Sequence, residues 1–244
     1  MDTTEVLNVP VSTYTKEESS QLLLGFLSEN RNHILITPNP EIVLEARKDP
    51  DLMRIIKSAD LVVPDGIGVV IASKFNKVKI PERVAGYDLI QGLFNNIKDG
   101  GATVYLLGGG KGVAELAAKN MMRKYKGLNI IGVNDGYFDG RKEKLIIEEI
   151  NRLKPDILLL GLGYPKQEKF ADKYKSALPV KLTCCIGGSF DVMSGKTKRA
   201  PELFQKLNLE WFYRLITEPS RFFRMLRLPL FMFIVIKEKL FGGN

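Results

Sequence analysis

The chain has 244 residues, of which 45% are hydrophobic and 26% charged, enough apolar mass for a large domain with its own core. Its formal net charge of +8 indicates an anionic partner such as phosphate, nucleic acid or acidic lipid. Its most apolar stretch, Leu228–Ile236, has nine residues where a membrane-spanning helix needs about 20, which excludes a spanning anchor there.

Apolar runs alternate with helical patterns from residue 33 to residue 190. Strands are predicted at 33–37, 60–63, 102–107, 129–133, 156–161 and 180–186. Helices are predicted at 40–48, 51–57, 67–74, 86–98, 111–125, 141–153 and 165–174. Several strands are apolar on both faces, which is typical of strands buried between two helix layers. The repeated strand–helix order predicts a doubly wound, mainly parallel, Rossmann-like α/β sheet.

The predicted strand ends are polar or rich in glycine. Ligands of doubly wound sheets bind beyond the carboxyl ends of the strands, so we expect the site there. Glycines 108–112 would let a phosphate approach the backbone N–H groups, although a tight turn would use the same glycines. The candidate binding residues at these ends are Thr37, Asn39, Gly109, Gly110, Gly136, Tyr137, Gly187 and Asp191.

Three further side chains are candidates for chemistry near these ends. Asp65 follows a predicted strand, and its carboxylate could take the proton from an attacking hydroxyl in an inverting sugar transfer, or cap a helix. Arg83 could pair bidentately with phosphate, or form a surface ion pair. Gln167, in the first turn of a helix, could contact donor phosphates or sugar hydroxyls, or could start a solvated helix.

The sequence offers little to a metal or a redox cofactor, and we expect neither. The only D-x-D pattern, Asp49-Pro50-Asp51, lies between two predicted helices and is interpreted as a capping turn. His33 is the only histidine, which excludes a His-based triad, and it is expected to pack at a strand start. The adjacent Cys184 and Cys185 are expected to be small buried strand residues in a reducing compartment.

The composition changes near residue 195, which divides the chain into a main domain (1–195) and an appendage (196–244). The appendage holds ten Lys and Arg against four Glu, and nine of the 22 aromatic residues. Arg214, Arg221 and Arg224 interleave with apolar residues, and Pro219 and Pro229 are expected to break the segment into short helices. This pattern suits an anionic membrane surface, and a helical layer over the sheet is the alternative.

Nucleic-acid binding is not expected, because the appendage aromatics sit among long aliphatic runs and the main domain is nearly neutral. The N-terminal residues 1–8 are acidic and polar, so no signal peptide is predicted and the protein is expected on the cytoplasmic side. A homo-oligomer in which the apolar tails pack together stays open.

Seven segments together resemble the WecG/TagA/CpsF family of bacterial glycosyltransferases, over about residues 6–241. They are TPNPE, ADLVVPDGIGVV, ERVAGYDL, YLLGGGKGVAE, GLGYPKQEKF, GGSFDVMSGKTKRAP and LNLEWFYRLITEPSRFFR. The resemblance implies an inverting, metal-independent enzyme that moves N-acetylmannosamine from UDP to the 4-hydroxyl of N-acetylglucosamine on undecaprenyl diphosphate. That reaction belongs to wall teichoic acid linkage-unit synthesis, at the inner face of the cell membrane.

The resemblance also implies roles for individual residues. By this resemblance Asp65 corresponds to the catalytic base, and Thr37 and Gln167 lie beside the sugar. The arginines at 214, 221 and 224 match the basic tail of the family. Those cations could stabilise the leaving diphosphate in place of a metal. Transfer of another hexose or a uronic acid, a Rossmann oxidoreductase and a membrane scaffold with a degenerate site are the alternatives. The oxidoreductase would need a GxGxxG pattern, which glycines 108–112 lack.

Overall fold

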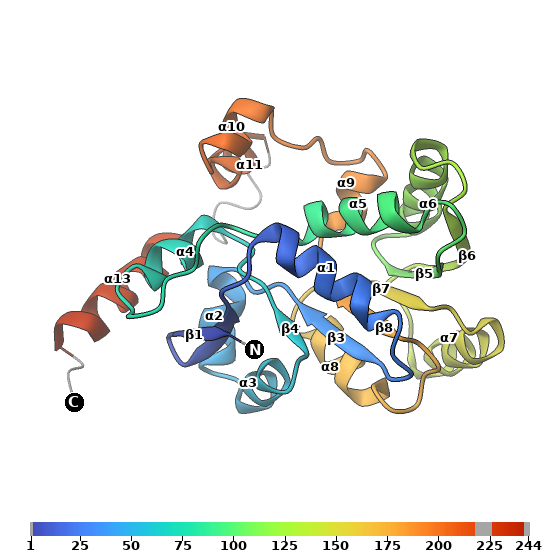
Figure 1. Ribbon diagram of the computed structural model, residues 1–244, viewed down its shortest axis with the longest axis horizontal. Helices are drawn as coiled ribbons and strands as arrows, with labels where there is room; N and C mark the ends of the chain where they lie inside the picture. Colours follow the sequence, from blue (N-terminus) through green and yellow to red (C-terminus); the bar gives the residue numbers. More distant parts are fainter. Residues whose placement is uncertain (1, 218–225, 242–244) are drawn as a thin grey trace.

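The computed structural model describes residues 2–217 and 226–241, and it contains a six-stranded sheet in the order β4-β3-β8-β7-β5-β6 (Figure 1). All neighbouring strands in this sheet pair in parallel. The strands are β3 (His33–Ile36), β4 (Leu61–Val62), β5 (Thr103–Gly108), β6 (Asn129–Asn134), β7 (Ile157–Gly161) and β8 (Leu182–Cys185). The predicted parallel α/β sheet is therefore confirmed.

Helices cover both faces of the sheet. One core contains buried residues of α2 (Pro40–Ala46), α3 (Pro50–Lys57), α4 (Ile67–Ser73), α7 (Gly140–Leu153) and α8 (Lys166–Tyr174). The other contains buried residues of α1 (Lys16–Phe26), α5 (Gly86–Ile97), α6 (Val113–Lys124) and α9 (Ser189–Met193). Successive strand residues enter opposite cores, since Leu158 belongs to the first and Leu159 to the second. Two buried faces explain why these strands are apolar throughout.

The segment before residue 33, for which no element is predicted, forms a hairpin followed by α1. Strands β1 (Thr3–Val6) and β2 (Val9–Ser12) pair antiparallel across a turn whose Leu7 and Asn8 both have positive φ. The hairpin is hard to predict because its strands are short and β2 contains Pro10, which is unusual in a strand.

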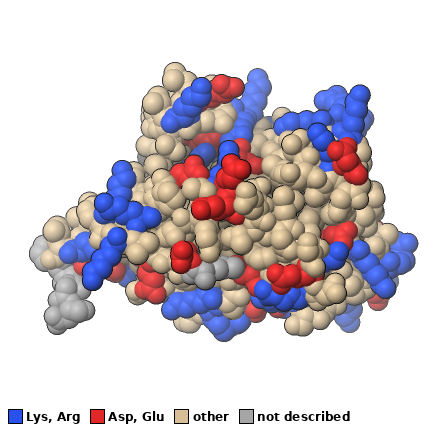
Figure 2. All heavy atoms as spheres, viewed as in Figure 1, with Lys and Arg blue, Asp and Glu red and all other residues tan. Residues whose placement is uncertain are grey.

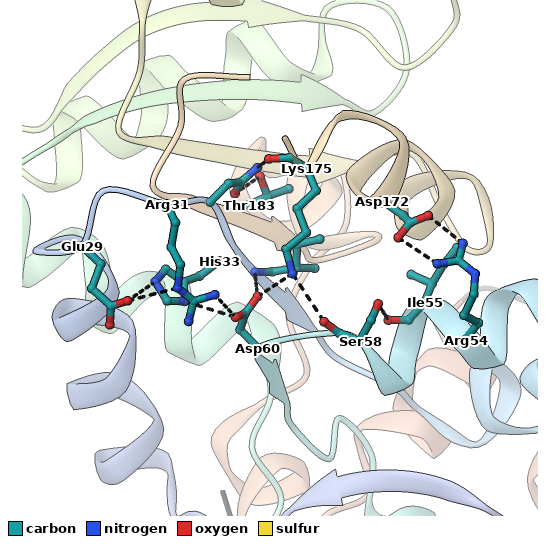
Figure 3. Close-up of polar contacts among 12 residues, drawn as sticks. Glu29, Arg31, His33, Arg54, Ile55, Ser58, Asp60, Asp172, Lys175 and Thr183 are labelled. Carbon is teal, nitrogen blue, oxygen red and sulfur yellow. Dashed lines mark hydrogen bonds and ion pairs between the residues drawn. The ribbon is translucent and has the colours of Figure 1, made fainter. Parts of the chain in front are cut away.

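His33 packs at the start of β3, as predicted, and lies at the end of the sheet opposite to the strand ends that carry the candidate site. Its ring is unexposed and stacks on Phe26 with 3.9 Å between centroids. Its two ring nitrogens lie 3.0 Å from Glu29 and 3.4 Å from Asp60, and Asp60 also pairs with Lys175 at 3.1 Å (Figure 3). These contacts join β3, β4 and the end of α8.

Two smaller predictions are also confirmed. Asp49 caps α3, because its carboxylate accepts the backbone N–H groups of Asp51 and Leu52 at 3.0 and 3.1 Å. Cys184 and Cys185 are buried in β8 with free thiols, and burial raises the pKa of both.

The C-terminal segment contains α10 (Glu202–Lys206), α11 (Glu210–Thr217) and α13 (Arg227–Phe241). The prediction that Pro229 breaks a helix is wrong: it lies in the first turn of α13, where a helix does not need its N–H group. Helix α13 packs on α2 and α4, and its Phe231 and Val235 are buried in the first core. Pro219 lies outside the described residues. Across residues 2–217 and 226–241, none of the helices combines the length and the apolarity that crossing a membrane requires.

Candidate functional site

A cavity of about 940 Å³ opens at the carboxyl ends of the strands, between the sheet, α11 and the start of α13. Below the α10–α11 lobe, acidic and basic side chains lie beside one another on the surface (Figure 2). The cavity brings together twelve of the fourteen residues predicted for the site, listed in chain order: Thr37, Asn39, Asp65, Arg83, Gly109, Gly110, Gly136, Tyr137, Gln167, Gly187, Asp191 and Arg214. Arg221 and Arg224 lie outside the described residues.

Asp65 lies on the cavity wall just beyond β4. It does not cap α4, whose N-cap is Gly66 with φ of 138° and no side-chain hydrogen bond. Instead its carboxylate accepts the backbone N–H of Gly86, the first residue of α5, at 3.3 Å. Burial raises the pKa of Asp65, and the nearby Arg83 and Arg214 partly offset that effect. A carboxylate that burial has made more basic suits a group that accepts a proton.

Thr37 follows β3 and is buried in the cavity wall. Its hydroxyl donates to the carbonyl of Cys185 at the end of β8, at 3.1 Å. The bond fixes the position of the hydroxyl, while its oxygen can still accept a hydrogen bond from a ligand. Asn39, two residues further along, caps α2 by accepting the N–H of Ile42 at 3.0 Å.

Gln167 is buried, so its interpretation as a solvated helix start is wrong. Its side-chain oxygen accepts the N–H of Gly187 at 3.1 Å, and its amide nitrogen donates to Glu168 at 2.8 Å. Burial raises the pKa of Glu168 to about 7. The Gln167 amide is therefore held between the turn after β8 and Glu168 of its own helix, so one of the supporting groups is an unpredicted buried carboxyl.

Glycine is required on steric grounds at the turn after β5. A Cβ at Gly108, where φ is 151°, would lie 2.5 Å from the backbone of Gly161 at the end of β7. This agrees with the tight-turn interpretation of that glycine. Gly110, in contrast, lies close to a cation. The ammonium of Lys196 would lie 3.9 Å from a Cβ built at Gly110. Both Gly110 and Lys196 line the cavity.

Ion pairs connect α11 to the start of α5 across the cavity. Arg83 pairs with Glu210 at 2.7 Å, so in this structure it forms the ion pair that was the alternative to phosphate binding. Arg199 pairs with Asp88 at 2.7 Å and with Glu210 at 3.4 Å, and lies over the ring of Tyr87. Glu210, the first residue of α11, therefore joins both arginines.

Arg214 lies on α11 four residues after Glu210, which places the two side chains on the same face of the helix. Trp211 of the same helix also lines the cavity. Because Glu210 is held by Arg83 and Arg199, α11 presents Arg214 toward the half-buried Asp65, where its charge partly offsets the burial that raises the pKa of this carboxyl.

Several charged residues of the cavity, among them Lys196, Arg199 and Glu210, were not predicted for the site. Lys166 donates to the carbonyl of Gly136 at 3.0 Å and so joins two strand-end turns. The strand-end rule could not find Lys196, Arg199 or Glu210, since they follow the last strand. The density of charge around residues 196–199 was the available signal. The described residues contain no group of three or more His, Cys, Asp or Glu side chains placed to hold a metal ion.

The Glycosyl transferase WecG/TagA/CpsF family matches residues 4–244 of the chain. Proteins named N-acetylglucosaminyldiphosphoundecaprenol N-acetyl-beta-D-mannosaminyltransferase are similar to it in three species. The one from Bacillus spizizenii is 38% identical, covering 90% of this chain and 85% of its own length. The one from Bacillus subtilis is 36% identical (98% and 93%), and one from Staphylococcus aureus is 32% identical (88% and 84%).

Proposed function

Since this chain belongs to the WecG/TagA/CpsF family of glycosyltransferases, we propose that it transfers N-acetylmannosamine from UDP-N-acetylmannosamine to N-acetylglucosamine on undecaprenyl diphosphate. The acceptor group is the 4-hydroxyl, the product is the wall teichoic acid linkage unit, and the anomeric configuration inverts. The observation that carries the proposal is one cavity in which Asp65 lies among Arg83, Arg214 and the glycine-rich strand ends.

Inversion requires the acceptor hydroxyl to attack the anomeric carbon from the face opposite to UDP. As the new C–O bond forms, the bond from that carbon to the diphosphate oxygen breaks, and its electron pair leaves with UDP. The proton of the attacking hydroxyl passes to Asp65. Burial favours this role, because it raises the pKa of the carboxyl and so makes it a stronger base.

Cationic side chains stabilise the charge that grows on the departing diphosphate. Arg214 and Lys196 line the cavity, and Arg83 would join them if it exchanged Glu210 for phosphate. Arg221 and Arg224, which follow α11 in the sequence, are further candidates. Fixed cations in a site shielded from water can stabilise the negative charge of the leaving group, as a metal ion does in other transferases. No metal or cofactor takes part in this scheme.

The remaining predicted residues bind the donor. Thr37 and Gln167 contact the sugar, and their fixed hydrogen bonds hold them in place for it. Gly109, Gly110 and Gly187 let the diphosphate approach the backbone, and Asp191 binds the ribose or the base edge. Asn39, Gly136 and Tyr137 complete the nucleotide pocket.

Residues 1–195 form the Rossmann-like catalytic domain, and residues 196–244 form an appendage that contributes Lys196 and Arg214 to the cavity and binds the cytoplasmic face of the membrane. The acceptor carries a polyprenyl chain, so the enzyme must work at a lipid surface. Helix α13 leaves Leu230, Phe233 and Leu240 exposed among basic residues, which suits peripheral binding to anionic lipid.

The Asp65→Asn variant tests the assigned base. It keeps the size of the side chain and removes the proton acceptor, so kcat should fall by about 100-fold or more while UDP affinity changes little. Asp139→Asn is the matched control: Asp139 also lines the cavity, but it caps α7 through the N–H of Lys142, and asparagine caps equally well. A near-normal rate for Asp65→Asn would assign the base to another residue.

A further inference from the structure

The segment that follows α4 is basic and apolar, and it belongs to no element described above. Between residues 66 and 81 there is no acidic residue, and the turn after α4 carries Lys74, Lys77 and Lys79. Between these lysines, Phe75 is 49% exposed and Val78 is 51% exposed. Aromatic and aliphatic side chains alternating with lysines are typical of a surface that meets anionic lipid.

Internal hydrogen bonds hold this turn in a fixed shape. Asn76 donates to the hydroxyl of Thr4 at 3.1 Å and to the carbonyl of Glu5, which ties the turn to β1. The buried hydroxyl of Ser73 accepts the N–H of Ile80 at 3.0 Å and closes the base of the turn. The fixed conformation of the turn therefore keeps the side chains of Phe75 and Val78 exposed to solvent.

The turn lies beside α13, because α4 and α13 run next to each other (Figure 1). Gly68 of α4 faces α13: a Cβ there would lie 2.7 Å from Leu228. Ile71 follows Gly68 by three residues and so lies on the same side of α4, and Phe75 lies two residues beyond the end of that helix. Both are exposed, like Phe233 of α13. Two neighbouring elements thus leave apolar side chains in solvent.

Helix α4 also links this turn to the cavity. Gly66, Ile67 and Gly68 line the cavity directly after Asp65, and α4 ends at Ser73. Seven helical residues rise by about 10 Å. A lipid surface that touches the turn would therefore lie about one short helix away from the cavity mouth, within reach of an acceptor whose lipid stays in the membrane.

We infer that residues 71–79 form a second membrane-contact element, in which the lysines at 74, 77 and 79 meet anionic headgroups while Phe75 and Val78 enter the interface. The inference rests on the proposed function, since that function places the acceptor in a membrane. It adds that the catalytic domain itself, and not only the appendage, binds the bilayer. Contact at both α4 and α13 fixes the orientation of the cavity toward the lipid.

Vesicle binding of the full chain tests the inference. The triple variant K74E/K77E/K79E should bind mixed phosphatidylcholine–phosphatidylglycerol vesicles roughly 100-fold more weakly than the wild type, because three attractive charges become repulsive. The matched control is K119E/R123E/K126E, in which exposed cations of α6 and the turn after it, at the opposite end of the molecule, are reversed. Both triple variants lower the formal charge from +8 to +2.

A second variant, F75S/V78S, should also weaken vesicle binding, and it leaves the net charge unchanged. The inference is overturned if K74E/K77E/K79E binds vesicles as tightly as the control triple, or if either turn variant alters only self-association of the chain. Transfer to a short-chain, water-soluble acceptor separates this failure from that of the proposed function. If the wild type transfers sugar to this acceptor but the turn variants bind vesicles as tightly as the wild type, the membrane element alone is refuted. If the wild type does not transfer sugar to this acceptor, the proposed function is refuted.

Discussion

At the scale of single residues, two carboxyls near the cavity have different surroundings, Asp65 being half-buried and Glu168 fully buried. Asp65 lies among arginines and lines the cavity, whereas Glu168 is fully buried behind Gln167 and has no cation against it among the groups that shift its pKa. Burial raises the pKa of both. The two carboxyls therefore suit different roles. Asp65 can exchange a proton with a ligand in the cavity, whereas Glu168, as a neutral acid, supports the Gln167 amide.

Glu168 should make the protein less stable as the pH rises from about 4.5 to 7. The folded state keeps a proton up to pH about 7, whereas the unfolded chain releases it near the ordinary value of 4.5. Over this window the unfolded state binds fewer protons, so stability falls with pH, by roughly 3 kcal/mol once the pH exceeds 7. Urea unfolding of Glu168→Gln at pH 5 and pH 8 measures the effect.

Glutamine at 168 still accepts the bond from Gln167, so the variant should lose most of this pH dependence and exceed the wild type in stability at pH 8. Glu148→Gln, an exposed substitution on α7, should retain the wild-type dependence. If wild type and Glu168→Gln lost stability equally between pH 5 and pH 8, Glu168 would not carry the proton described here.

At the scale of elements, α11 is held over the cavity by a few ion pairs rather than by a core. It has no fully buried residue, and its Glu210 pairs with both Arg83 and Arg199. The Arg83 and Glu210 side chains are 13% and 18% exposed, so their pair is less screened by solvent than a surface pair. The attachment of α11, and with it the position of Arg214, depends on Glu210.

Glu210→Gln should loosen α11 while the sheet stays folded. The charge is lost and the size is kept, so the amides of α11 should exchange hydrogen about tenfold faster or more. Because Arg214 lies on the same helix, kcat should fall more than UDP affinity. Glu202→Gln on α10 is the control, since Glu202 is exposed and pairs with Lys206 of its own helix at 4.0 Å. Equal exchange of α11 in both variants would show that Glu210 does not hold the helix.

At the scale of the whole molecule, a parallel sheet explains why so much of the site could be predicted. It gathers all its strand carboxyl ends on one edge, so Thr37, Asp65, Gly109 and Gly187 could be assigned to one site without knowledge of any contact. The apolar strands themselves were equally recognisable, since both faces are buried.

The parts that could not be predicted depend on long-range packing. Arg199 reaches Asp88, which is 111 residues away, because the segment after α9 folds back onto the first turn of α5. Gln167 and Glu168 are buried because α8 packs against the sheet. From sequence alone, polar residues at the start of a helix are expected to be exposed to solvent. Pro229 was misread because a proline in the first turn of a helix is compatible with that helix.

Sugar transfer from a UDP donor to a lipid-linked acceptor is the activity proposed for the whole molecule. The most direct test incubates the wild-type chain with a short-chain N-acetylglucosaminyl diphospholipid and, in turn, UDP-N-acetylmannosamine, UDP-N-acetylglucosamine and UDP-glucose, and measures UDP release and product mass. We predict acceptor-dependent UDP release with UDP-N-acetylmannosamine and a product one N-acetylhexosamine heavier than the acceptor. UDP release that does not depend on the acceptor, or transfer from none of these donors, would contradict the account.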